Sequence, residues 1–162
     1  MALSSEDAWQ VLATIEDPEI PALSILDLGI VRCVEMEGGD LRVTLTPTYA
    51  ACPALKVIES KAASALEERG FQRVRIEITL SAPWTPDDVT DAGRRKLEEA
   101  GIAPPPKRTG TGNVDSDKVA IRCPLCGSVR TSTRSEFGST LCKSLRYCAD
   151  CHQAFEYFKE LR

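Results

Sequence analysis

The sequence predicts an α+β protein with a small mixed three-stranded sheet and packed helices, followed by a C-terminal four-cysteine ribbon module. Three observations support this prediction. Helical and alternating apolar patterns follow one another in the order helix, hairpin, helix, strand, helix. A proline- and glycine-rich stretch, Ala103–Gly112, then interrupts them. Two C-x2-C cysteine pairs follow, and such pairs are typical of a tetrahedral metal site.

Apolar spacing and capping residues define the elements of the front part. Ser4 or Ser5 can cap a first helix, which ends at Asp17-Pro18 because the residue before a proline avoids the helical conformation. The elements that follow are a hairpin with strands at Ile30–Met36 and Leu41–Thr46, a helix from Pro53 to about Arg69, a strand at Arg73–Leu80 and a helix from Thr85 to about Ala100. A right-handed crossover would make the third strand parallel to one hairpin strand.

Charge and composition divide the chain. Residues 1–117 carry 12 Lys/Arg and 20 Asp/Glu, a net −8, whereas residues 118–162 carry 8 and 4, a net +4, together with five of the seven cysteines. We therefore predict a front domain over residues 1–102, a linker over 103–117 and a metal-binding ribbon over 118–162.

The cellular compartment follows from what the sequence lacks. No apolar run approaches a membrane span, and Met1–Gln10 has neither the basic start nor the apolar core of a signal peptide. We expect a cytoplasmic protein that does not engage a membrane. In that reducing compartment, spaced cysteine pairs indicate metal more often than disulfides.

Cys52 is the candidate functional residue of the front domain. Pro53 suits the first helical position, so Cys52 falls at or next to the N-cap, where unpaired N–H groups and the helix dipole lower a thiol's pKa. The thiolate is the form that binds metal. The alternative is a small buried apolar thiol, and placement alone does not decide between the two.

Two further features of the front domain have an ordinary structural interpretation. Asp17, Glu19 and Asp27 lie in one proline-bound loop and could help bind a cation or a basic partner, but turn and capping chemistry is the favoured explanation for any single one of them. Cys33 lies mid-strand among Val31 and Val34, where we expect a packed, inert thiol.

The ribbon carries the strongest motif. Cys123 and Cys126 form one C-x2-C pair and Cys148 and Cys151 the other, a spacing that predicts a four-thiolate structural zinc site. A rubredoxin-like iron uses the same ligands. About forty-five residues cannot build much core, so a bound metal would supply the folding energy. Cys148–Cys151 with His152 also matches c-type haem attachment, which the expected compartment argues against. We expect Cys142 to be packed.

These residues resemble those of a known family. The resemblance lies in Asp17–Pro21, Ser24–Gly29, Thr46–Pro53, Gly93–Pro105, Phe137–Leu145 and Phe155–Lys159, which look like the PaaD (PaaJ) phenylacetate-degradation proteins. The front part is similar to the SufT-like metal–sulfur cluster assembly domain. The resemblance implies a role supporting the multicomponent phenylacetyl-CoA epoxidase, and Cys52 matches the assembly domain's characteristic cysteine.

The leading functional hypothesis is a maturation factor in which Cys52 transiently holds iron or an iron–sulfur unit and the ribbon docks the client. The partners would be epoxidase components or iron–sulfur assembly proteins, and a homodimer is compatible with this. No catalytic activity of its own is expected, because the one histidine, His152, lies in the ribbon and no phosphate-binding loop is present.

Three alternatives remain open at this point. A nucleic-acid-binding ribbon is compatible with its basic charge, although the acidic front domain disfavours it. A non-catalytic structural subunit of the epoxidase is a second alternative. A thiol redox enzyme using Cys52 is a third, but the front domain offers no nearby resolving partner.

Overall fold

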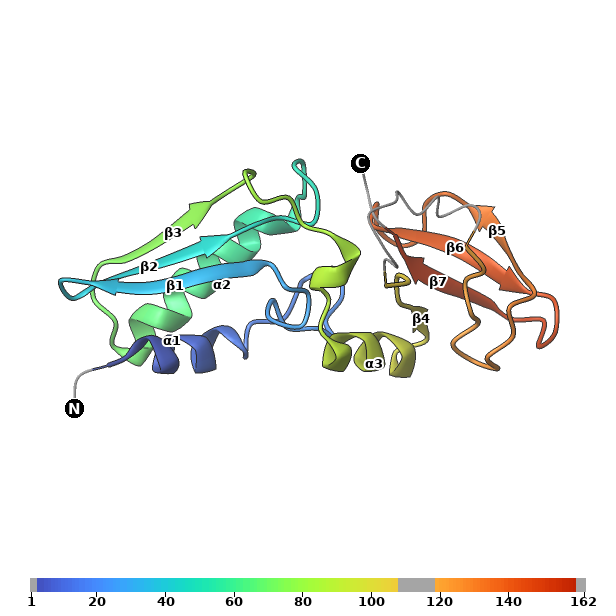
Figure 1. Cartoon of the computed structure of the whole chain (residues 1–162), viewed down its shortest axis with the longest axis horizontal. Helices are drawn as coiled ribbons and strands as arrows, with labels where there is room; N and C mark the ends of the chain where they lie inside the picture. Colours follow the sequence, from blue (N-terminus) through green and yellow to red (C-terminus); the bar gives the residue numbers. More distant parts are fainter. Residues whose placement is uncertain (1–2, 108–118, 160–162) are drawn as a thin grey trace. The chain divides into compact units, whose positions relative to one another are not determined.

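The computed structural model describes residues 3–107 and 119–159 of the chain (Figure 1). The chain forms two compact units, Met1–Gly93 and Arg94–Arg162. The division at Gly93 lies ahead of the predicted end of the front domain at residue 102, because the residues that follow Gly93, including a short strand at Ile102–Ala103, belong to the second unit. Most of the predicted linker, residues 108–117, lies outside the described residues. Within the described part, no helix is long and apolar enough to cross a membrane.

The first unit begins with α1, Ser5–Leu12, which is capped as its sequence predicts. The Ser4 hydroxyl accepts the N–H of Asp7, and the Asp7 carboxylate accepts the N–H of Ser4, so the two residues form a capping box. The helix ends well before Pro18. Leu12 and Ala8 are fully buried, which places them on the face that α1 turns toward the core.

The three-stranded sheet has the predicted mixed topology. Its strands are β1, Val31–Glu37, β2, Asp40–Leu45, and β3, Val74–Ile78, in the order β1-β2-β3. The hairpin pair β1–β2 is antiparallel, and β2–β3 is parallel. The crossover is α2, Ala54–Arg69, which ends at Gly70 in the left-handed conformation, φ 110°.

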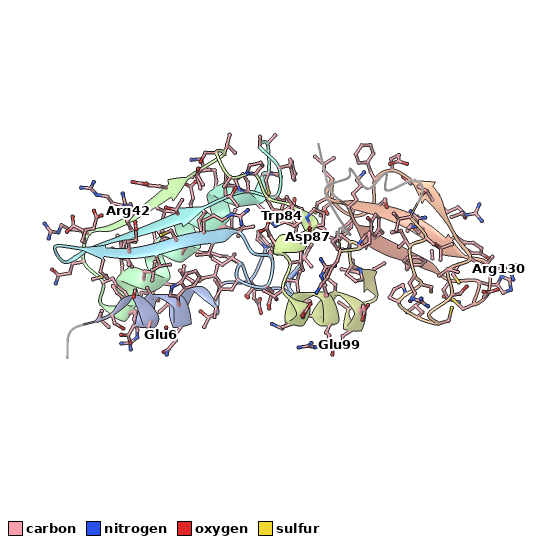
Figure 2. The ribbon with its side chains drawn as sticks, in the orientation of Figure 1. Glu6, Arg42, Trp84, Asp87, Glu99 and Arg130 are labelled. Carbon is pink, nitrogen blue, oxygen red and sulfur yellow. The ribbon has the colours of Figure 1, made fainter. Side chains whose placement is uncertain are left out.

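Helices α1 and α2 cover one face of this sheet and close the core of the first unit (Figure 1). The β2 residues that alternate inward are fully buried: Leu41, Val43 and Leu45. The opposite face is polar. Arg42, labelled in Figure 2, lies on that face and pairs with Glu35 and Glu37 of β1.

The predicted helix over Thr85–Ala100 is wrong in its first part. A single 3₁₀ turn, Pro86–Asp88, is closed by a capping box between Thr85 and Asp88. The buried Val89 is then extended, with φ −66° and ψ 121°, and α3 runs only over Asp91–Glu99. The Thr90 hydroxyl accepts the N–H of Gly93, which gives α3 a start of its own.

The second unit is built on a four-stranded sheet in the order β4-β7-β6-β5. Its strands are β4, Ile102–Ala103, β5, Thr131–Ser135, β6, Lys143–Cys148, and β7, Ala154–Phe158. The pairs β5–β6 and β6–β7 are antiparallel, and β4–β7 is parallel. The predicted α+β class with a C-terminal ribbon is confirmed.

Candidate metal centre and thiol site

The four paired cysteines converge on one point of the second unit. All four sulfur atoms lie within 4.8 Å of one another, with Cys123 Sγ 3.8 Å from Cys151 Sγ and Cys126 Sγ 3.6 Å from Cys148 Sγ. A tetrahedron with metal–sulfur bonds of about 2.3 Å has edges of about 3.8 Å. The sulfur positions therefore fit a four-thiolate zinc or iron ion without rearrangement of the chain.

Two tight turns, called knuckles here, aim the sulfurs. In the first, Gly127 N–H donates to Cys123 O at 2.9 Å, and Cys123 N–H donates to Ser128 O at 2.8 Å. In the second, His152 N–H donates to Cys148 O at 3.0 Å, and Cys148 N–H donates to Gln153 O at 2.9 Å. The repeated pattern explains why C-x2-C is a reliable signal: the turn itself brings both sulfurs to one side.

Backbone donors also act on the sulfurs. The N–H groups of Cys151 and Asp150 stabilise the Cys148 thiolate and, against burial, lower its pKa to about 6. Burial and the neighbouring sulfurs raise the pKa of Cys151 to about 12. The thiols of Cys148 and Cys151 thus do not ionise alike, and a bound cation would supply the charge that stabilises all four thiolates together.

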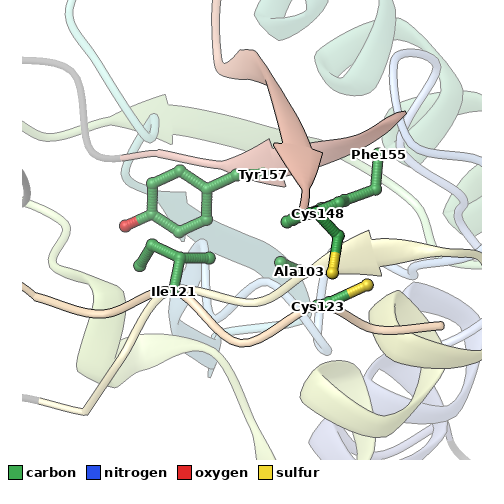
Figure 3. Close-up of a cluster of buried hydrophobic side chains, with 6 residues drawn as sticks. All are labelled: Ala103, Ile121, Cys123, Cys148, Phe155 and Tyr157. Atoms are coloured by element: carbon green, nitrogen blue, oxygen red, sulfur yellow. The ribbon is translucent and has the colours of Figure 1, made fainter. Parts of the chain in front are cut away.

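A small apolar cluster supports the two buried ligands (Figure 3). Cys123 and Cys148 belong to a group of side chains that are at most 4% exposed; the others are Ala103, Ile121, Phe155 and Tyr157. This is little core for a unit of this size, so a metal bound by the four cysteines would supply much of its folding free energy.

A polar link between the knuckles was not predicted from the sequence. Asp150, in the second knuckle, accepts a hydrogen bond from Ser128 Oγ and pairs with Arg130 at 2.7 Å. Arg130 is labelled in Figure 2. No sequence signal identifies such a link, because the partners are some twenty residues apart and each is an ordinary surface residue. Cys142 is buried outside the cluster, packed as predicted, with its sulfur 3.1 Å from Thr140 Oγ1.

Cys52 lies between the end of β2 and the start of α2, as predicted. Pro53 is the N-cap of α2 and Ala54 its first residue, so Cys52 immediately precedes the cap. The N–H groups of Ala54 and Leu55 act on the Cys52 sulfur, which is half-buried. Because β2 and β3 are parallel, this is the carboxyl edge of that pair, where α/β units place their sites.

The expected lowering of the Cys52 pKa is wrong. Burial raises the pKa of this thiol above its ordinary value, and the two N–H groups offset the effect only in part. The charges of Glu19 and Asp17 raise the pKa further. This raised pKa favours the protonated thiol near neutral pH, and the nearby carboxylates favour a cation over a free thiolate.

The structure brings two of the three predicted acidic residues within electrostatic reach of Cys52. Asp17 Oδ1 accepts the N–H groups of Glu19 and Ile20, both at 2.8 Å, which is the turn chemistry considered from sequence. Asp27 Oδ2 accepts the N–H and hydroxyl of Ser24, both at 2.9 Å. Asp17 and Asp27 thus fix the shape of the loop.

Cys33 does not lie in the buried core, contrary to the expectation of a packed thiol. It pairs with Thr44 on the polar face of the sheet and is half-buried. Burial and the nearby Glu35 raise its pKa, so a slow reaction with alkylating reagents is still expected. The alternation of apolar residues in β1 did not reveal on which face of the sheet Cys33 lies, because a bulge shifts the register between Val31 and Cys33.

Comparisons with known proteins match both units. Residues 5–78 match the family model of an iron–sulfur cluster assembly protein, and residues 107–159 match that of the PaaD zinc beta ribbon domain. The fold of the first unit is also that of a domain of unknown function from Bacillus anthracis, with a TM-score of 0.55, 21% identity, and coverage of 57% of this chain and 90% of that one.

Two curated relatives have informative names. A protein of Porphyromonas gingivalis (strain ATCC BAA-308 / W83), "Fe-S protein maturation auxiliary factor", is 31% identical over 58% of this chain and 90% of its own length. A protein of Escherichia coli (strain K12), named as a putative subunit of 1,2-phenylacetyl-CoA epoxidase, is 40% identical over 94% of this chain and 91% of its own length. The chain therefore belongs to the PaaD family, in which an iron–sulfur cluster assembly domain is followed by a zinc ribbon with four clustered cysteines.

Proposed function

We propose that this protein is a cytoplasmic maturation factor for the multicomponent phenylacetyl-CoA epoxidase, assisting assembly of an iron or iron–sulfur centre in that enzyme. The observation that carries the proposal is the thiol of Cys52, which lies next to the start of α2 and within electrostatic reach of the carboxylates of Glu19 and Asp17. The names of the two curated relatives support it from both directions, one as an epoxidase component and one as a maturation factor.

In this proposal, iron or an iron–sulfur unit is the cargo of the first unit. The carboxylates of Asp17 and Glu19 attract the cation, and the Cys52 sulfur binds it as its proton is released to solvent. The N–H groups of Ala54 and Leu55 then stabilise the sulfur's remaining negative charge. Because the pKa of Cys52 is raised, the proton competes with the metal, which favours transient binding over permanent binding. Asp27 supports the site by holding the loop through Ser24.

The ribbon metal has a structural role in this proposal. Cys123, Cys126, Cys148 and Cys151 would hold zinc, whose four ligands leave no open position for chemistry. The matched zinc-ribbon family favours zinc over iron. The folded ribbon is then the docking module for the client, and no catalytic activity belongs to the chain itself.

The test measures iron on the client. The epoxidase components are purified from cells that carry the wild-type chain, Cys52→Ala or Cys33→Ala, and their bound iron and activity are measured. Cys33 is the matched control, because it is a second half-buried thiol of the first unit with a raised pKa. We expect loss of iron and activity with Cys52→Ala and neither with Cys33→Ala. Full iron loading and activity with Cys52→Ala would refute the proposal.

A second candidate is a non-catalytic structural component of the epoxidase, which the name of the E. coli relative favours. A structural component would remain in the assembled enzyme in fixed proportion. It would also tolerate Cys52→Ala, provided the fold is kept. The composition of the purified enzyme therefore separates the two candidates: a maturation factor should be absent from the active complex once iron is bound.

A further inference from the structure

The loop between β5 and β6, residues 136–142, presents two large apolar side chains to solvent. Phe137 is 56% exposed and Leu141 is 50% exposed, although neither belongs to the metal site or to the core of the second unit. Exposed side chains of this size are ordinary when scattered singly. Two of them on one short loop are less ordinary, and such groups mark interaction surfaces when the loop is held in place.

Hydrogen bonds hold this loop in one conformation. Ser135 Oγ accepts the N–H of Phe137 at 3.2 Å and donates to its carbonyl at 2.8 Å. Gly138 N–H donates to Lys143 O at 2.7 Å, and Ser139 N–H donates to Glu156 Oε1 at 2.6 Å. A Cβ at Gly138 would lie 2.6 Å from Glu156 Oε1, so a larger residue here would displace the carboxylate that accepts the Ser139 N–H.

The phenyl ring itself is oriented by a cation. Lys159 Nζ lies 4.4 Å from the centroid of the Phe137 ring, and the side chain of Lys159 is only 13% exposed. The same ammonium donates to Glu136 O and lies 3.9 Å from Glu136 Oε2. The ring is thus positioned without being buried, and the free protein has already met the ordering cost of presenting it.

We propose that the 136–142 loop is the docking element of the ribbon and that it inserts Phe137 and Leu141 into an apolar pocket, rimmed by carboxylates, on a partner protein. Aromatic side chains that fill a pocket on the partner are frequent interface hot spots, and preorganisation lowers the ordering cost of binding.

The charge of the partner's rim follows from the second unit. Its described residues 119–159 carry six Lys/Arg and three Asp/Glu, and Lys159 lies directly against the Phe137 ring. The one carboxylate of the loop, Glu136, is already paired with Lys159. A partner with acidic groups around its pocket would complement this surface.

This inference rests on the proposed function for the partner's identity, an epoxidase component that receives the metal. The experiment uses the full-length, metal-loaded chain and the purified epoxidase components, each immobilised in turn, with binding measured at low and high salt. The variants are Phe137→Ser, Leu141→Ser and the milder Phe137→Leu. Val129→Ser is the matched control, because Val129 is 51% exposed in the same unit but follows the first knuckle. Metal content and circular dichroism verify folding.

We expect one component to bind, more weakly at high salt. Phe137→Ser should weaken binding by about 30-fold or more, as truncation of a hot spot does. Leu141→Ser and Phe137→Leu should each weaken binding by less than Phe137→Ser. The control Val129→Ser should weaken binding by less than about threefold. Wild-type affinity in Phe137→Ser, an equal loss in Val129→Ser, or no binding of any component by the wild type would overturn the inference. Cys52→Ala should bind normally, so failure of docking and failure of metal delivery are distinguishable.

Discussion

His152 occupies in the second knuckle the position that Gly127 occupies in the first, and the two share a left-handed backbone, with φ of 58° and 78°. The N–H of each donates to the carbonyl of the first cysteine of its own pair, at 3.0 and 2.9 Å. The two halves of the metal site are therefore near copies. The first half uses glycine, which adopts the left-handed conformation freely, and the second half uses histidine, which does not.

Gly127→Ala should lower the free energy of unfolding of the metal-loaded second unit by about 1–2 kcal/mol. A Cβ at this position meets nothing within 4 Å, so the whole loss would be backbone strain. His152→Gly should raise the free energy of unfolding, because it relieves the backbone strain. The gain should be smaller than the loss in Gly127→Ala, because His152→Gly also removes the 3.2 Å contact between Tyr147 Oη and His152 Nδ1. Thermal unfolding at fixed metal concentration measures both, and an unchanged midpoint in Gly127→Ala would refute the strain at this position.

Cys123→Ser or Cys151→Ser should unfold the second unit and leave the first intact. The buried cluster beneath the ligands is small, so loss of the metal removes most of what holds the four-stranded sheet. Limited proteolysis should then leave a protected fragment that ends near Gly93. Cys142→Ser is the control, since Cys142 lies outside the ligand set. A second unit that stays protease-resistant after complete metal removal would contradict this prediction.

Glu19→Gln should speed alkylation of Cys52 by a few-fold at about pH 8. Burial raises the pKa of Cys52, and the charges of Glu19 and Asp17 raise it further, so removing one charge increases the thiolate fraction. Asp17 is unsuitable for this test, because its carboxylate accepts two backbone N–H groups. Iodoacetamide labelling followed by mass spectrometry gives the rate. An unchanged rate would mean that Glu19 has no electrostatic effect on Cys52.

Asp88→Asn should destabilise the first unit near neutral pH. Burial opposes the charged form of Asp88, but Arg32, at 2.8 and 3.1 Å, and the Thr85 N–H outweigh it and lower the pKa of this carboxyl. The stabilisation is therefore complete above the ordinary pKa of about 4 and is lost as the pH falls through the lower folded value. Urea unfolding should show a difference of roughly 1–3 kcal/mol at neutral pH that shrinks below about pH 4. A difference that persists undiminished in strong acid would refute the assignment.

The parts of the fold that were predictable are those set by local chemistry. The serine cap of α1, the stop at Gly70 and the two C-x2-C turns each depend on a few adjacent residues, and the structure has all of them. The predicted helix from Thr85 failed because a second local signal, the Thr90 cap, competes with the first. The buried Val89 between them decides the break, and burial is a property of the whole unit.

The candidate thiol site shows the same limit. The position of Cys52 at a helix start follows from Pro53, but the direction of its pKa shift does not. Burial and two carboxylates from a loop more than thirty residues earlier outweigh the helix N–H groups. The position of Cys52 at the helix start includes neither the burial nor the carboxylates, so on its own it predicts a lowered pKa, which is the wrong direction.

The pairing of β4 with β7 determines where the chain can be cut. Ile102 and Ala103 cover one edge of β7, and Ala103 is part of the buried cluster beneath Cys123 and Cys148. A ribbon fragment that starts at residue 118 would lose this strand and expose the main-chain donors and acceptors of β7, which is the condition for edge-to-edge aggregation. A fragment that starts at Arg94 keeps the edge covered, and it should therefore stay monomeric at concentrations where the shorter one precipitates.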